Sequence, residues 1–179
     1  MVAAVGAAKI KSRAEADPKF DFGTVRTWEW DLGGAGDVML ARAADDDPAV
    51  IKQRVDPVIV AAVSAELGRR GLTFAQGGSA DIRMHYYLLV TVGAATQEMG
   101  QFLPPVPEWG VPPFAPATTA LDIVQRGSIV LDAFGRTADR VVWRGVAQSD
   151  IDQIKTDKER DERIRDSVRD LIKRLPIKS

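Results

Sequence analysis

The sequence predicts an α+β fold: a single two-layer domain with a mostly antiparallel sheet of four to five strands and two helices on one face. Three observations predict it. Residues 127–150 have the pattern of a β-hairpin, residues 80–92 alternate as one long strand, and two helical stripes of apolar residues precede residues 71 and 176. With 179 residues and 45% hydrophobic residues, the chain is long enough for one core. We expect residues 1–8 to form a flexible tail, and residues 9–179 to form a single domain with a proline-rich insert at residues 94–117.

Composition excludes several classes of function. The 24 basic and 25 acidic side chains nearly cancel, so no strong field attracts nucleic acid or an anionic membrane surface. The chain has no cysteine, which excludes disulfides, thiolate chemistry, cysteine-based zinc sites and lipidation of these residues. No apolar run approaches the ~20 residues of a membrane-spanning helix. We expect no cofactor and no metal.

The first elements are two strands and a loop. Residues 9–16 alternate between charged and smaller side chains, which is typical of an edge strand. After a turn at Asp17, residues 21–30 predict a second strand that places Trp28 and Trp30 on one face. Two tryptophans could form a ligand platform, although burial in the core is the favoured interpretation for such large rings. Residues 31–48 contain three glycines and an Asp run, and we expect them to form a loop.

The first helix is predicted to end at Gly71. Asp56 followed by Pro57 resembles a cap and a first helical position, and a short extra turn from Pro48 is the alternative start. The apolar stripe of this helix recurs at intervals of three and four residues. It comprises Val55, Ile59, Ala62, Val63 and Leu67.

The strand at residues 80–92 places His85 and Tyr87 on one face, which we expect to be partly solvated. A metal site that uses a pair of histidines needs a second one, and this sequence has none. An ordinary cross-strand histidine is therefore favoured over a metal ligand or a catalytic base.

The insert that follows is rich in proline and aromatic residues. Six of the ten prolines fall between Pro104 and Pro116, interleaved with Phe102, Trp109 and Phe114. Such a segment forms neither a helix nor an inner strand. It could present polyproline turns to a partner, or its rings could fold back over the second face of the sheet.

The predicted hairpin is apolar on both faces. One side carries Ile129, Leu131, Val141 and Trp143, and the other carries Val130, Phe134, Val142 and Val146. Such a sheet needs another structural layer packed against each of its two faces. The helices can supply one, which leaves the insert, a ligand, or a second subunit in a homodimer for the other. Asp132 lies inside this apolar pattern, and we expect a structural pair with Arg144 on the paired strand.

The last helix begins at a capping box, formed by Thr156 and Glu159, and Pro176 closes it. Its apolar stripe comprises Ile164, Val168, Leu171, Ile172 and Leu175.

Three segments resemble a known family. The opening segment carries Asp17, Pro18, Asp21, Phe22, Arg26, Thr27, Trp28 and Trp30. The strand ADIRMHYY and the hairpin GSIVLDAFGRTADRVVWRGVA follow in the same order. Together they resemble the bacterial domain-of-unknown-function 4136 family, and the run Trp143-Arg144-Gly145 is the most specific match. The resemblance implies a small sheet with two helices, a periplasmic or outer-membrane-associated lipoprotein domain, and no established activity or catalytic residues. The long insert and the missing lipobox cysteine depart from the family pattern, so we expect natural lipidation upstream of Met1.

These observations predict a non-enzymatic domain of the cell envelope that binds another envelope component. The alternative is a carrier of a small apolar ligand, enclosed between the sheet and the insert. The candidate binding residues are Phe102, Trp109, Phe114, Tyr87 and His85, and the candidate structural residues are Asp132, Arg144, Trp143, Trp28 and Trp30. A hydrolase that uses Asp132 or His85 is less favoured, because a nucleophile, a base and an orienting group at recognisable spacing are missing.

Overall fold

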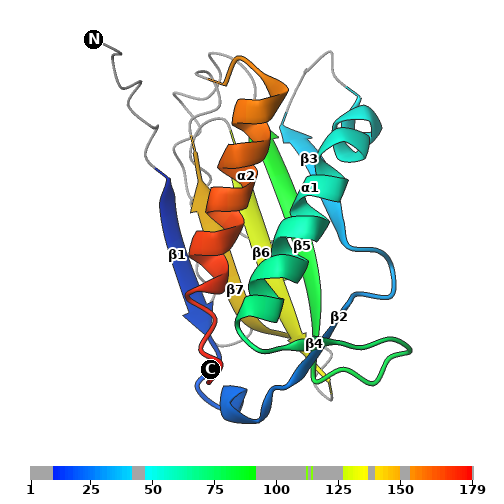
Figure 1. Cartoon of the computed structure of the whole chain (residues 1–179), viewed down its shortest axis with the longest axis vertical. Coiled ribbons are helices and arrows are strands. Elements are labelled where there is room, and N and C mark those ends of the chain that lie inside the picture. Colours follow the sequence, from blue (N-terminus) through cyan, green and yellow to red (C-terminus); the bar gives the residue numbers. More distant parts are fainter. Residues whose placement is uncertain are drawn as a thin grey trace.

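The computed structural model describes residues 10–41, 47–91, 112, 114, 127–136, 140–149 and 154–178. In this part of the chain, two helices cover one face of a seven-stranded sheet (Figure 1). The elements are β1 (Lys11–Ala16), a 3-10 turn (Phe22–Thr24), β2 (Thr27–Trp30), β3 (Gly36–Ala41), α1 (Pro48–Arg69), β4 (Thr73–Phe74), β5 (Ile82–Thr91), β6 (Ser128–Gly135), β7 (Val141–Gln148) and α2 (Asp157–Ile172).

The sheet is mixed, so the prediction of a mostly antiparallel sheet of four to five strands is wrong. Its order is β1-β7-β6-β5-β2-β4, and β3 also pairs with β5. The pairs β1–β7, β7–β6 and β6–β5 are antiparallel, whereas β2–β5, β2–β4 and β3–β5 are parallel. The chain from β3 through α1 to β5 is a β-α-β crossover, which is how two neighbouring strands become parallel.

The prediction that residues 31–48 form a loop is wrong, and one of the three parallel pairs depends on these residues. Residues 36–41 instead form β3, which pairs with residues 86–91 of β5. Gly36 lies opposite Tyr86, and a Cβ atom at Gly36 would lie 2.3 Å from the Tyr86 ring. Glycine is therefore required there, because the tyrosine ring crosses the neighbouring strand.

Helix α1 begins earlier than Asp56, at Pro48. Asp47 is the N-cap, and its side chain accepts a hydrogen bond from the Ala49 N–H at 2.9 Å. Pro57 lies inside the helix, where it lacks the N–H of an ordinary residue. The buried residues of α1 are nonetheless the predicted stripe, and Gly71 follows the helix at φ +83°.

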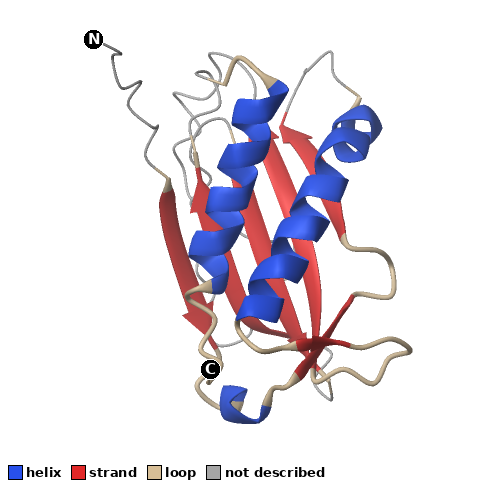
Figure 2. Cartoon of the chain, in the orientation of Figure 1, coloured by secondary structure: helices blue, strands red, loops and turns tan. Residues whose placement is uncertain are grey.

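Helix α2 packs beside α1 on the same face of the sheet, as Figure 2 shows. The predicted capping box is confirmed, since Thr156 accepts from the Glu159 N–H and Glu159 accepts from the Thr156 N–H. At the other end of the helix layer, the Arg70 guanidinium donates to the carbonyl oxygens of Ile172, Lys173, Leu175 and Ile177. Arg70 thus satisfies carbonyls that a helix end leaves unpaired.

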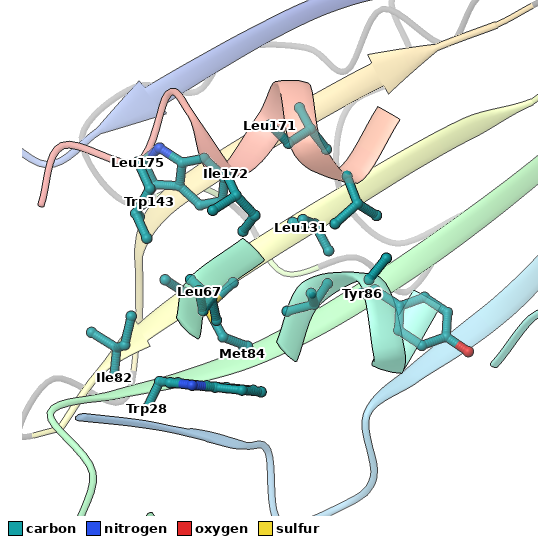
Figure 3. Packing of buried hydrophobic residues seen from close by; sticks show 14 of the residues in the cluster. Trp28, Leu67, Ile82, Met84, Tyr86, Leu131, Trp143, Leu171, Ile172 and Leu175 are labelled. Atoms are coloured by element: carbon teal, nitrogen blue, oxygen red, sulfur yellow. The ribbon is translucent and has the colours of Figure 1, made fainter. Parts of the chain in front are cut away.

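The main core lies between the helices and the sheet. Figure 3 shows Trp28, Met84, Leu131 and Trp143 of the sheet against Leu67, Leu171 and Ile172 of the helices. The hairpin is present as predicted, but a bulge between Ala133 and Phe134 changes which residues share a face. Val142 joins Trp143 in this core, whereas Val141 pairs with Phe134.

Candidate functional site

The second face of the sheet, opposite the helices, carries a row of ionisable side chains across four strands. The register places His85 of β5 opposite Asp132 of β6, Asp132 opposite Arg144 of β7, and Arg144 opposite Glu15 of β1. Asp37 of β3 extends this row, because its Oδ2 lies 3.1 Å from Nε2 of His85. Acidic and basic groups therefore alternate along the row.

The centre of the row is a buried ion pair. Nε of Arg144 donates to Oδ1 of Asp132 at 2.7 Å, and Nη2 donates to Oδ2 at 2.6 Å. Asp132 is 0% exposed and Arg144 is 5% exposed. Burial raises the pKa of the Asp132 carboxyl above its ordinary value, and the Arg144 guanidinium opposes that shift. The pairing that the sequence predicted is thus present, in the two-pronged geometry that suits arginine and carboxylate.

His85 and Tyr87 lie beside this pair and are buried, although the sequence predicted a partly solvated face. Their ring centroids are 4.7 Å apart. Burial raises the pKa of the Tyr87 hydroxyl, and the charge of Asp132 adds to that effect. Nδ1 of His85 is buried and has no hydrogen-bond partner among the described residues. A binding role for His85 and Tyr87 stays a prediction.

Two residues of the proline-rich insert, Pro112 and Phe114, lie in the described part of the chain. The carbonyl oxygen of Pro112 accepts a hydrogen bond from Nη2 of Arg144 at 2.5 Å, which places this residue on the second face. Phe114 is 5% exposed. Both observations agree with an insert that folds back over the sheet at these two residues. Phe102 and Trp109 lie outside the described residues, so their proposed role stays a prediction.

The residues that carry the family resemblance have roles in the fold itself. The Oδ2 atom of Asp81 accepts from the N–H groups of Arg26 and Thr27 and from the Thr27 hydroxyl, each at 2.9 Å. These bonds lower the pKa of the Asp81 carboxyl. Asp17 accepts from the Lys19 N–H and pairs with Arg140, which lowers its pKa as well. These carboxylates join segments that are far apart in sequence.

The Trp143-Arg144-Gly145 run has a similar explanation. Trp143 is completely buried in the helix-side core, and its ring lies over Gly145. A Cβ atom at Gly145 would lie 2.6 Å from the Trp143 ring and 3.1 Å from Leu171 of α2. The run therefore combines a core ring, a glycine that makes room for it, and the arginine of the buried ion pair on the other face.

The tryptophans of β2 belong to the fold in the same way. Trp28 is 1% exposed, and its ring makes edge contacts with Trp30 and with Phe74 of β4. Trp30 is partly buried against the core. These contacts agree with core packing, which is the favoured interpretation of the two tryptophans.

A cavity of about 290 Å³ lies on the helix-covered face, near the N-terminal ends of both helices. Figure 1 shows that both helices begin at the same end of the molecule. The apolar wall includes Ile51, Val55, Leu88, Ile129, Ala147 and Ile164. The polar lining residues are Ser149, Arg160, Arg163 and Ser167. Helices α1 and α2 and strands β5, β6 and β7 all contribute, so both layers line this partly open cavity.

The sequence does not predict this cavity. The predicted ligand position, between the sheet and the insert, lies on the opposite face. The lining residues look like ordinary core residues in the sequence, and only their convergence in space leaves a gap. In the described ranges, no group of three or more His, Cys, Asp or Glu side chains is placed to hold a metal ion, and no helix is long and apolar enough to cross a membrane.

Comparisons with known proteins agree with the fold. The chain is similar to a DUF4136 family protein from Bacteroides thetaiotaomicron, with 14% identity, a TM-score of 0.52, and coverage of 88% of this chain and 93% of that one. It is also similar to a PDZ domain protein from Parabacteroides distasonis, with 11% identity and a TM-score of 0.53. That match covers 95% of this chain but 37% of the other. Identities this low show the fold alone.

None of the curated proteins matches this sequence. A family model does, and it is described as a domain of unknown function, DUF4136. The match covers residues 12–177, from β1 to the residues after α2, and it includes all three segments on which the resemblance was based. The chain therefore belongs to the DUF4136 family.

Proposed function

We propose that this chain is a non-enzymatic domain of the bacterial cell envelope, and that it holds a small apolar ligand in the cavity between the two helices and the sheet. The observation that carries the proposal is the cavity itself. Native interiors pack closely and leave few voids larger than a water molecule. A partly open space of about 290 Å³ with a mainly apolar wall is therefore left unfilled between the helices and the sheet.

The size and the lining of the cavity favour a small molecule. An engineered apolar cavity of ~150 Å³ remains dry and binds benzene, so the space here is roughly twice what one such ring needs. Ligand sites in proteins are typically apolar with a few polar groups that orient the ligand. Ala147 and Ile164 form part of the apolar wall, and Arg160 and Arg163 supply polar groups of this kind.

The ionisable row of the second face supports a role without catalysis. Asp132 and Arg144 bond each other, and the Asp132 carboxylate is completely buried. Neither group is open to a substrate in this arrangement. We also prefer the cavity to this face as the binding site, because Tyr87, Val130 and Val146 are already buried within the single chain.

The envelope location rests on the family resemblance. An upstream reading frame that encodes a signal sequence and a lipobox cysteine is the expected finding. A natural start at Met1 with neither feature would count against the location but would leave the cavity proposal intact.

The cavity is tested with the purified chain and a fluorescent apolar probe, N-phenyl-1-naphthylamine. We expect the probe to bind with a rise in emission, and native mass spectrometry to detect a retained ligand in protein from the natural host. Ala147→Met places a larger side chain into the cavity and should weaken probe binding at least about tenfold. Ala61→Met, at an exposed position of α1, is the matched control and should leave binding unchanged.

Two outcomes would contradict the proposal. One is a folded wild-type chain that neither binds the probe nor retains a ligand. The other is an Ala147→Met variant that binds the probe as well as wild type, because the probe would then occupy some other part of the molecule.

A further inference from the structure

The charged groups that line the cavity lie on a single helix. Arg160 and Arg163 are one turn apart on α2, and they are the lining residues in the described part of the chain that carry a formal charge. Both are partly buried. A ligand that fills the apolar space therefore meets two guanidinium groups at one side and no carboxylate among the described lining residues.

The position of one of these guanidinium groups is held by its own helix. Nε and Nη2 of Arg160 donate to Asp161 Oδ1 at 3.0 and 2.7 Å, and Nη1 donates to Asp157 Oδ1 at 2.8 Å. These bonds use three of the five N–H donors of an arginine. The guanidinium is thus oriented before a ligand arrives, which reduces the entropy that binding must overcome.

The volume limits the apolar part of the ligand. A space of about 290 Å³ accepts an alkyl chain of roughly ten carbon atoms, if a benzene ring with six carbons fits ~150 Å³. One such chain fills the space, whereas two long chains of a membrane phospholipid exceed it and would extend outside the cavity. The size therefore favours a single-chain molecule that leaves the membrane on its own.

We propose that the cavity takes a free single-chain amphiphile, with its alkyl tail against the wall formed by residues such as Ile129 and Ile164 and a carboxylate head group at Arg160 and Arg163. This inference rests on the proposed function and adds the chemical class of the ligand. Arginine suits a carboxylate because its planar fork can donate two parallel N–H bonds to the two oxygens. Asp157 and Asp161 offset the charge of Arg160, so the preference against a cationic head group rests on the described lining residues, which include no carboxylate.

The test compares three ligands that share a ten-carbon tail: decanoate, decan-1-ol and decyltrimethylammonium. Each is titrated against the chain with bound N-phenyl-1-naphthylamine, at one ionic strength and pH 7.5. Decanoate should displace the probe at a concentration about tenfold lower than decan-1-ol, which corresponds to one charge-assisted hydrogen bond, and the cation should be weakest.

Two variants locate the head group. Arg160→Gln/Arg163→Gln should weaken decanoate about tenfold and leave decan-1-ol unchanged. Lys158→Gln/Lys173→Gln removes the same net charge from exposed positions of α2 and its C-cap, outside the cavity lining, and should change neither ligand. Thermal unfolding of each variant checks that it is folded.

The inference is overturned if wild type binds decanoate no better than decan-1-ol, and this ranking needs no variant to fold. It is also overturned if the two double variants lose decanoate affinity equally, because the preference would then reflect net charge alone. If the probe binds but none of the ten-carbon ligands displaces it, this inference is wrong and the proposed function is still supported. Absence of probe binding to wild type removes the proposed function as well.

Discussion

On the helix-covered face of the sheet the buried side chains are mainly apolar and leave a cavity of about 290 Å³, whereas the second face buries Asp132, Arg144 and His85 in one row. The polar groups of that row require particular partners, since a buried charge without one is costly. An apolar wall accepts any apolar group of suitable size. The difference teaches that the second face depends on particular partners, while the helix-covered face leaves the space in which we propose that a ligand binds.

Breaking the buried ion pair is expected to have the largest effect. Arg144→Met leaves the Asp132 carboxylate buried without its partner and should lower the free energy of unfolding by about 3–5 kcal/mol. The measurement is equilibrium unfolding in urea at pH 7. The double variant Asp132→Leu/Arg144→Met should recover most of this loss, because it removes both charges. A single variant that costs less than about 1 kcal/mol would show that the second face does not depend on the pair.

The next effect concerns the polar anchor of the helix layer. Arg70→Ala removes the hydrogen bonds to the Ile172, Leu175 and Ile177 carbonyls and should cost about 2 kcal/mol. Its neighbour Arg69 is the control, because its side chain is 66% exposed and pairs with Glu66 at the surface. Arg69→Ala should cost less than about 0.5 kcal/mol in the same urea titration. Equal losses for the two variants would contradict the assignment of Arg70 as the anchor.

A smaller and pH-dependent effect is expected at Asp81, which joins β2 to β5. Asp81→Asn should lower the free energy of unfolding at pH 7 by about 1 kcal/mol, because the amide oxygen is a weaker acceptor for the Arg26 and Thr27 N–H groups. The folded-state pKa of Asp81 lies below its ordinary value of 3.8. Its contribution is therefore fully present well above pH 3.8 and is lost as the pH falls through the folded-state pKa.

The measurement for Asp81 is the difference in unfolding free energy between wild type and variant at several pH values. This difference should be constant between pH 6 and pH 8 and should shrink below pH 4. A difference that grows as the pH falls would mean that the pKa of Asp81 is raised in the folded state.

The smallest expected effect is a gain. Ala147→Met fills part of the cavity on the helix-covered face, so it should raise the free energy of unfolding by up to about 1 kcal/mol in the ligand-free chain. Ala61→Met, which is exposed, should stay within about 0.5 kcal/mol of wild type. Thermal unfolding of both variants checks this prediction. A marked loss at Ala147 would show that the space is too small or too rigid for a ligand.

Local patterns in the sequence determined the helices and the hairpin. The stripes from Val55 to Leu67 and from Ile164 to Ile172, and the capping box at Thr156, depend on residues within a few positions of one another. Such patterns have a local physical cause. A helix buries one side, which requires the apolar stripe, and it leaves its first N–H groups unpaired, which requires the cap. The pairing of Asp132 with Arg144 could be anticipated for a related reason, since a charge inside an apolar strand needs a partner nearby.

Only the tertiary structure decided the parallel half of the sheet, the bulge and the cavity. Residues 36–41 become a strand because β5 lies beside them. In the sequence, helix α1 separates these two paired strands. The bulge after Ala133 places Val142 on the helix side together with Trp143, although consecutive residues of a regular strand point to opposite faces. Ile51, Leu88 and Ala147 line a cavity because three distant segments converge without filling the space between them. Long-range contacts of this kind leave no local pattern, since each residue is compatible with a packed core.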